Sequence, residues 1–586
     1  MKHASIIALL LAALFPQVAA GGDFDDFCET FSAAWVRADP QLATTLQYFN
    51  GAEQDALDRR LTPITREART ARIAAARRGL AELKRFDTAG LDASQRISAA
   101  VLQWHLDDIT RGEPFADYAY VFQQYNGLQV QLVNFLTQTH PIRNRRDIEN
   151  YLARLELVAS QIDEGIEQAK DRAARGILPP RFILVATIEQ FSRFLAGPSQ
   201  ENVLVASLAE RAARVKELSS ADRTTFLAAA EKSVSASIIP AFRRAREMLE
   251  SQLNKAVEDA GLGRFPDGDR AYAQALRRYT TTDYSAAQIH ALGLKEVARI
   301  EKQMDELLRE CGYDKGSVED RMKRLDADSQ PPDVPDPRAV ILAKYEEILR
   351  DAQMRSNTVF DLRPKAAVVV KREPEFTEKN ASAHYAAPAA DGSRPGVFWV
   401  PLPGPPYRIC EMRTLLYHEA IPGHHFQIAL QNEMSGLPRF RRERVFGSIS
   451  AFSEGWALYA ERLAAELGWY DSDPKGQLGQ LNAELFRARR LVVDTGLHAL
   501  RWTRQQAIDY GVSATEVDRY VVTPGQACSY KIGQLRILEL RDNARSVLAE
   551  KFSLQGFHNV VLRAGTVPLD VLQQVLDNYV KTSDSH

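Results

Sequence analysis

Apolar residues recur at intervals of three and four positions over a long stretch of the chain, from about Ala52 to Arg324. The stretch is also rich in Ala, Leu, Glu, Arg and Lys, and segments 147–176 and 224–253 show the pattern most clearly. This spacing places the apolar side chains on one face of an α-helix. Gly176 stands where the first of these two helices should end. The sequence therefore predicts a mainly α fold, without the fixed-period repeat of a solenoid.

A segment rich in proline and aspartate, 326–338, interrupts this pattern. Its four prolines and four aspartates cannot continue a helix, so it is predicted to be a linker. A chain of 586 residues exceeds what one core usually organises, which favours two lobes. We expect an N-terminal helical lobe over 21–325 and a second, catalytic lobe over 339–586.

The second lobe changes character along its length. A helix is expected over 339–351, and two short strands within 366–376 and 396–403, which are rich in β-branched and aromatic residues. From Glu411 onwards the helical pattern returns. A small sheet placed just before reactive helices is a sensible layout, because an exposed strand edge can hold an extended peptide.

The first twenty residues have the order of a signal peptide. Lys2 precedes an apolar run from Ile6 to Phe15, and small residues lead to a predicted cleavage point after Ala20. The run is too short to span a bilayer. Because no cysteine stands at the position that a lipoprotein needs, we expect a soluble periplasmic or secreted product.

The remaining composition excludes several classes of partner. A formal net charge of −2 implies neither nucleic acid nor an anionic membrane as a partner, and no later stretch is apolar enough for a membrane span. The four cysteines lie far apart, which leaves disulfide pairing open and argues against a thiolate zinc site. They are Cys28, Cys311, Cys410 and Cys528.

The segment LLYHEAIPGHHFQ, residues 415–427, carries most of the chemistry. His418 and Glu419 begin like the zinc motif H-E-x-x-H, but the next histidines, His424 and His425, follow six and seven positions after His418. In a regular helix, a spacing of six residues places the second histidine on a different face from His418. A spacing of seven residues separates the two histidines by a rise of ~10 Å, which is too far for one ion. An undistorted helix therefore cannot build the site.

Pro422 and Gly423 supply a distortion, since proline breaks the hydrogen-bond pattern and glycine tolerates unusual dihedrals. A bulge there is expected to return His424 to His418. We favour His424 as the second ligand of one zinc ion per chain, with His425 as the alternative or as a substrate contact.

A third ligand is expected from SISAFSEGWALYAERL, residues 448–463. Glu454 lies 30 residues after His424, and its apolar neighbours argue that its carboxylate is buried and needs a partner. Glu461, two turns further on nearly the same face, is the competing candidate. Two histidines and one glutamate leave the fourth position of a zinc ion to water.

The remaining roles follow from such a metal. Glu419 would take the proton of the activated water and protonate the leaving amine. The oxyanion still needs a donor, for which Tyr530 and His498 are candidates, while Lys531 or Arg490 would receive a substrate carboxylate.

Four motifs together resemble the bacterial family known as domain of unknown function 885, which is grouped with gluzincin-like metallopeptidases. They are YHEAIPGHHFQ, FSEGWALYAE, VDTGLHALRWTRQQAIDY and PGQACSYKIGQLRILELR; segments 384–400 and 140–155 also fit. The resemblance implies a two-lobed, zincin-like helical fold similar to Taq-type carboxypeptidases, oligopeptidases and angiotensin-converting enzyme. By motif, His418, Glu419, His424 and Glu454 match the zinc and base set, and Tyr530 matches the oxyanion donor.

The expected function is a zinc metallopeptidase, an exopeptidase or oligopeptidase acting on short peptides, with carboxypeptidase action favoured by the cationic candidates. Two alternatives remain. One is a zinc amidase or esterase with a non-peptide substrate, and the other is a peptide-binding protein that keeps the fold without catalysis.

Overall fold

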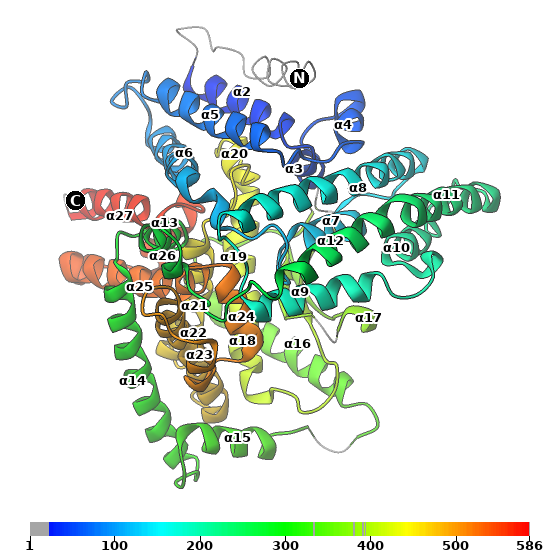
Figure 1. Cartoon of the computed structure of the whole chain (residues 1–586). Helices are drawn as coiled ribbons and strands as arrows, with labels where there is room; N and C mark the ends of the chain where they lie inside the picture. Colours follow the sequence, from blue (N-terminus) through cyan, green and yellow to red (C-terminus); the bar gives the residue numbers. More distant parts are fainter. Residues whose placement is uncertain (1–22, 332–333, 379–380, 390–391, 393, 585–586) are drawn as a thin grey trace. The chain divides into compact units, whose positions relative to one another are not determined.

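The structure is a computed structural model that describes residues 23–331, 334–378, 381–389, 392 and 394–584 (Figure 1). The predicted signal peptide, 1–20, lies outside these residues. The described chain is mainly helical with one small three-stranded sheet, as the sequence predicts. Among the described helices, none combines the length and the apolar character that crossing a membrane requires. All four cysteines are free thiols, so the disulfides left open by the sequence do not form.

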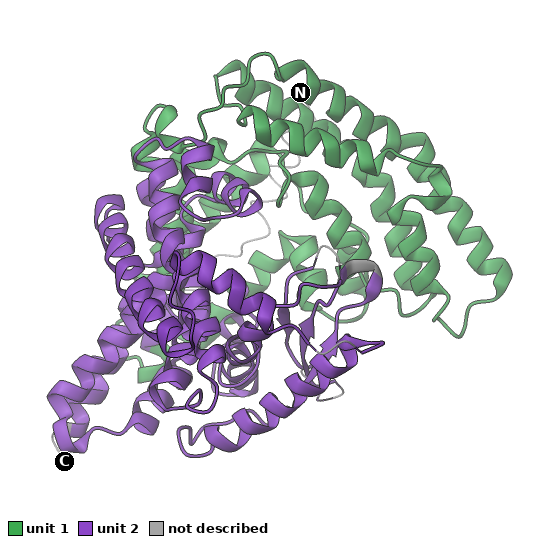
Figure 2. Cartoon of the chain, turned by 90° about the horizontal axis from the view of Figure 1, so that it is seen from below, with its two compact units in different colours: residues 1–95, 102–271 green, residues 96–101, 272–586 purple. Residues whose placement is uncertain are grey.

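The chain divides into two compact units (Figure 2). Unit 1 comprises residues up to 95 and 102–271, and unit 2 comprises 96–101 and 272 onwards. The division differs from the predicted one, because the proline-rich segment 326–338 lies inside unit 2. Helices α14 (Ala286–Glu310) and α15 (Val318–Asp328) share an apolar core with α22 (Pro474–His498), which ties them to the C-terminal part of the chain.

Unit 1 is built around α8 (Arg145–Ala174), which corresponds to the predicted helix over 147–176. Ile148, Tyr151 and Leu155 on one face of α8 are fully buried in the core of this unit. The predicted helix over 224–253 consists of α11 and α12, joined by a single π-helical turn. The helices of unit 1 besides α8 are α2 (Phe24–Arg37), α3 (Pro40–Leu46), α4 (Gly51–Asp58), α5 (Arg66–Leu83), α7 (Leu128–Asn134), α9 (Arg181–Phe194), α10 (Val203–Ala212), α11 (Ser220–Ser233) and α12 (Ile239–Gln252).

Unit 2 holds the sheet and every residue that the sequence singles out for chemistry. The segment predicted as a helix over 339–351 is α16, which is longer at both ends. Helices α6 (Ala93–Gly112) and α13 (Gly268–Thr280) run across the division between the units. The further helices of unit 2 are α16 (Pro337–Ser356), α17 (Glu375–Glu378), α18 (Met412–Glu419), α19 (His424–Glu433), α20 (Arg439–Arg442), α21 (Ser450–Glu466), α23 (Arg504–Asp509), α24 (Ala514–Val522), α25 (Ser529–Leu548), α26 (Leu554–Ala564) and α27 (Leu569–Asp584).

The sheet has the strand order β1-β3-β2. Strand β3 (Gly396–Val400) lies in the middle, parallel to β1 (Val368–Arg372) and antiparallel to β2 (His384–Ala386). The two predicted strands correspond to β1 and β3. Strand β2 was not predicted, because only three of its residues pair with β3 and the surrounding segment has the composition of a turn. It is an outer strand of the sheet, with β3 on one side.

Two glycines allow α21 and α25 to approach each other at backbone distance. A Cβ atom added to Gly455 would lie 2.5 Å from the carbonyl carbon of Gly533, and one added to Gly533 would lie 2.0 Å from the oxygen of Ala451. Gly455 therefore brings the helices of Glu454 and Tyr530 together.

Candidate metal centre

A break between two helices, rather than a bulge within one, brings His424 back beside His418. Helix α18 ends at Glu419 and α19 begins at His424. Gly423 lies against the last turn of α18, where an added Cβ would stand 1.9 Å from the carbonyl oxygen of His418. Only glycine fits such an approach. The imidazole rings of His418 and His424 consequently have their centroids 4.9 Å apart.

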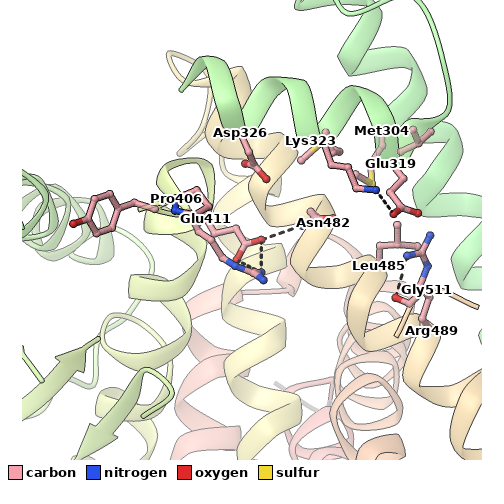
Figure 3. A pocket seen from close by; sticks show the side chains of 14 residues that line it. Met304, Glu319, Lys323, Asp326, Pro406, Glu411, Asn482, Leu485, Arg489 and Gly511 are labelled. Atoms are coloured by element: carbon pink, nitrogen blue, oxygen red, sulfur yellow. Dashed lines mark hydrogen bonds and ion pairs between the residues drawn. The ribbon is translucent and has the colours of Figure 1, made fainter. Parts of the chain in front are cut away.

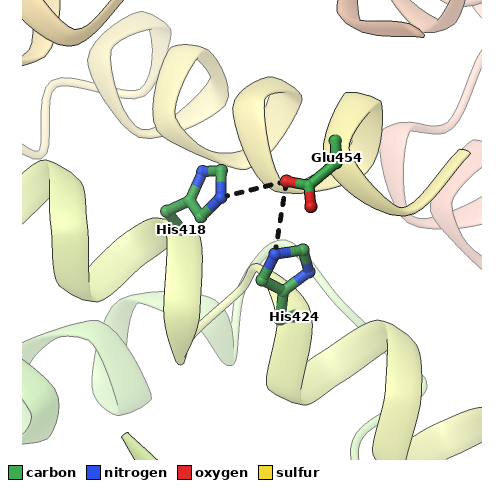
Figure 4. A group of neighbouring side chains, drawn as sticks. All are labelled: His418, His424 and Glu454. Atoms are coloured by element: carbon green, nitrogen blue, oxygen red, sulfur yellow. Dashed lines mark ion pairs between the residues drawn. The ribbon is translucent and has the colours of Figure 1, made fainter. Parts of the chain in front are cut away.

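Both imidazoles point at one carboxylate oxygen of Glu454 on α21 (Figure 4). The Nε2 atoms of His418 and His424 lie 3.4 Å and 3.6 Å from Oε2 of Glu454, and the ligand atoms of the three residues all lie within 4.8 Å of one another. Two ligands about 2.1 Å from a tetrahedral zinc ion lie ~3.4 Å apart, so the donor set fits a shared ion.

Glu461 lies behind His418 and fixes its orientation. Its Oε1 is 2.7 Å from Nδ1 of His418, and its Oε2 accepts a hydrogen bond from the hydroxyl of Thr414. The Nδ1–H group therefore donates to Glu461, and Nε2 is the ring nitrogen that faces Glu454 and would bind a metal. The competing ligand of the sequence analysis thus holds a ligand in place instead.

The charges around the cluster favour a cation. Although burial by itself lowers the pKa of His418, the Glu454 and Glu461 carboxylates raise it to about 9. Burial raises the pKa of Glu454, but the two histidines outweigh it and lower that pKa below its usual range. The carboxylates therefore stabilise positive charge at this point, as a divalent ion requires.

Glu419 is buried beside the same cluster, with 8% of its surface exposed. Burial raises its pKa, and the charge of Glu454 acts in the same direction, while His418 and His424 oppose the shift. A carboxylate with a raised pKa is a better proton acceptor at neutral pH than an ordinary one. Its place and its electrostatics therefore suit a general base.

His425 points away from the cluster, towards the sheet. Its Nε2–H donates to the carbonyl oxygen of Ala366, 3.1 Å away, and its Nδ1 lies 2.9 Å from the hydroxyl of Tyr385 on β2. Burial lowers its pKa to about 4, so the ring is neutral. Since both ring nitrogens have partners, His425 is left out of the cluster, and His424 takes the place beside His418.

Tyr530 and Arg490 lie close to the cluster. Burial and the charge of Glu454 raise the pKa of Tyr530, so its phenol keeps its proton and can donate. The guanidinium carbon of Arg490 lies 4.5 Å from the centre of the Tyr530 ring.

The side chains of Lys531 and His498, in contrast, are buried and have partners within the core. The Lys531 amino group lies 2.6 Å from Glu484 and 3.0 Å from Glu296, with no exposed surface. His498 is fully buried, and its Nε2 lies 3.1 Å from the carbonyl oxygen of Tyr520. The structure therefore does not bring these two candidates to the cluster.

Several contributors were missed by sequence reasoning. Trp456 donates its indole N–H to the oxygen of Pro422, 3.0 Å away, and so fixes the turn between α18 and α19. Glu461 was weighed only as a ligand, although its seven-residue spacing from Glu454 put it on the right face. For Tyr385 the sequence holds no signal, because the residue reaches His425 only through the sheet.

A separate pocket of about 420 Å³ lies elsewhere in unit 2, between α14, α15 and α22 (Figure 3). Two ion pairs lie among its lining residues: Lys323 is 2.8 Å from Glu319, and Arg408 is 3.2 Å from Glu411. None of the residues predicted for chemistry lines it.

The chain matches the family described as a bacterial protein of unknown function (DUF885) over residues 40–576, whereas no curated protein matches it. A crystal structure from Colwellia psychrerythraea, provisionally described as a lipoprotein, is similar with a TM-score of 0.86 and 30% identity, over 95% of this chain and 99% of that one. A protein from Shewanella oneidensis, provisionally described as a lipoprotein of unknown function, has a TM-score of 0.73 at 18% identity, over 95% and 100% of the two chains. The second likeness concerns the fold alone. The chain belongs to the DUF885 family.

Proposed function

We propose that this protein is a zinc-dependent metallopeptidase that hydrolyses short peptides. The observation that carries the proposal is the convergence of His418, His424 and Glu454 at spacings that suit one tetrahedral ion. Glu419 follows His418 directly and is buried next to this set. A binding module has no use for a buried base beside two imidazoles and a carboxylate.

The residues of the chain divide the reaction between them. Bound by the three ligands, zinc supplies Lewis acidity towards water and the scissile carbonyl. Glu419 accepts a proton from the attacking water and passes it to the nitrogen of the leaving amine as the C–N bond breaks. Tyr530, which keeps its phenolic proton, donates a hydrogen bond to the oxyanion.

The sheet supports a peptide as the substrate. Strand β2 is an outer strand, and its Tyr385 contacts His425, the residue after the ligand His424. An extended peptide can add to such an edge through main-chain hydrogen bonds and reach the candidate metal centre. A zincin-like fold of the gluzincin type, with carboxypeptidase or oligopeptidase action, is part of the same proposal.

We also infer that the protein works outside the cytoplasm, in the periplasm or after secretion. Residues 1–20 have the pattern of a signal peptide, and the two similar structures are provisionally described as lipoproteins.

The test is a Glu419→Gln variant, assayed against a panel of short peptides, with Glu539→Gln as the control. Glu539 is an exposed residue of α25 that pairs with Arg536 at 2.6 Å. We expect Glu419→Gln to keep its zinc and to lose about 100-fold or more in turnover, the usual contribution of a general base. Undiminished peptide hydrolysis would refute the assigned base. Wild-type protein that holds zinc but cleaves only esters or non-peptide amides would favour the amidase alternative.

A further inference from the structure

Two hydrogen-bond donors of Arg490 have no partner among the residues that the structure describes. Its side chain is buried, with 7% of the residue exposed, yet its Nε and Nη1 atoms have no hydrogen-bond partner. Only Nη2 is paired, at 3.2 Å from Glu516. A buried charged donor without an acceptor is costly, and native proteins rarely keep one unless it has a purpose.

The guanidinium is also held in a fixed position. Its central carbon lies 4.3 Å from the centre of the Phe486 ring and 4.5 Å from that of Tyr530. The two aromatic contacts hold the planar group, while its Glu516 partner is shared with Arg519, whose Nη2 lies 2.9 Å from the same oxygen. One carboxylate therefore serves two guanidinium groups, and Arg490 keeps positive charge to offer a ligand.

Tyr530 connects Arg490 with the metal centre. It carries the ring that contacts Arg490. Its neighbour Ser529 lies 2.7 Å from the hydroxyl of Ser450, one turn before Glu454 on α21. A second arginine, Arg487, lies one helical turn before Arg490 on α22. The Nε atom of Arg487 is likewise buried without a partner. Helix α22 thus carries two guanidinium groups with unsatisfied donors, and that of Arg490 lies against the ring of Tyr530.

Arg490 differs in its contacts from Lys531, the other residue predicted to receive a substrate carboxylate. Lys531 lies within 3.0 Å of two carboxylates, those of Glu296 and Glu484, which neutralise its charge. Of these two cationic candidates, Arg490 is therefore the one that has donors left for an anion.

We propose that Arg490, assisted by Arg487, binds the C-terminal carboxylate of the substrate, so that the enzyme removes residues from the free C-terminus of short peptides. A guanidinium donates charge-assisted N–H bonds to a carboxylate, and Arg490 has Nε and Nη1 donors left for such bonds, on two different edges of the group. The inference rests on the proposed peptidase function and specifies its substrate class.

The experiment compares two forms of the same short peptide, one with a free C-terminal carboxylate and one with a C-terminal amide. Wild-type protein should hydrolyse the free acid with a kcat/KM about 100-fold higher, since the amide lacks the negative charge that strengthens its hydrogen bonds with the guanidinium. Arg490→Gln should reduce the kcat/KM for the free acid by about 100-fold more than it reduces the kcat/KM for the amide. The matched control is Arg489→Gln, because Arg489 is the next residue on α22 and pairs with Glu301 at 3.1 Å.

A binding measurement provides a second readout. The free-acid peptide should bind the Glu419→Gln protein at least tenfold more tightly than the Glu419→Gln, Arg490→Gln double variant, by calorimetry, while zinc content and thermal unfolding stay alike. Equal hydrolysis of acid and amide by the wild type, or an equal loss of both in Arg490→Gln, would overturn the carboxylate site and leave the peptidase intact. If zinc-loaded wild type cleaved neither peptide, the proposed function would fail, and this inference with it.

Discussion

Replacing Glu461 by glutamine should weaken zinc binding without disturbing the fold. The side chain is 1% exposed and sits behind His418, with Oε1 2.7 Å from Nδ1. The amide oxygen of glutamine can still accept this N–H, so the ring keeps its orientation. What the variant loses is the negative charge that makes the opposite nitrogen a stronger ligand.

The size of the effect follows from this contact. Changing such a carboxylate partner typically costs 10- to 100-fold in metal affinity, or roughly 1.4–2.7 kcal/mol of binding free energy. We expect the lower part of this range for Glu461→Gln, because the hydrogen bond survives. Glu461→Ala should reach the upper part, because it also leaves the hydroxyl of Thr414 without its acceptor.

The assay is a titration of apo-protein with zinc in competition with a chelating dye. Glu466→Gln is the matched control, since Glu466 lies on the same helix but pairs with Arg462 at 3.1 Å, away from the histidines. Circular dichroism and thermal unfolding establish that the variants fold. Zinc affinity in both Glu461 variants equal to that of the control would refute the role given to this carboxylate.

Three further predictions concern the surroundings of the centre. Burial raises the pKa of Asp494 to about 7, far above its value of about 3.9 in an unfolded chain, so the folded state holds this proton more tightly. Protonated Asp494 therefore contributes to the free energy of unfolding below about pH 4, and this contribution, on the order of 4 kcal/mol, is lost as the pH rises to about 7. Asp494→Asn should abolish this loss, as measured by denaturant unfolding at a series of pH values. Gly455→Ala should destabilise the fold by about 1–3 kcal/mol, because the added Cβ would lie 2.5 Å from the backbone of Gly533. Gly436→Ala is the control, since its Cβ would meet nothing within 4 Å. Equal melting temperatures of the two variants would contradict this prediction. Tyr530→Phe should lower turnover by about 100-fold at unchanged zinc content, and full activity would remove Tyr530 from the mechanism.

Local patterns in the sequence predicted much of the fold. Helix α8 and strands β1 and β3 were accessible because period and residue type decide them within a few residues. The division of the chain was not accessible, because α14 and α15 belong to unit 2 through packing on α22, far away in sequence. A proline-rich segment marks where a helix must end, but it carries no information on which core the next helix joins.

The candidate site shows the same limit. His418, His424 and Glu454 were accessible because their residue types and order restrict the chemistry. The choice against His425 required the turn at Gly423, which depends on contact with the carbonyl of His418. Lys531 was misleading for a related reason: its partners Glu296 and Glu484 come from distant parts of the chain, and no local pattern reports them.

The most direct test of the account is the zinc content of purified protein, measured by elemental analysis in the wild type, in Glu454→Gln and in the control Glu466→Gln. The account predicts about one zinc per chain in the wild type and the control, and little in Glu454→Gln. Wild-type protein that binds no zinc even after zinc is added back, or a Glu454→Gln variant with the same content, would contradict it.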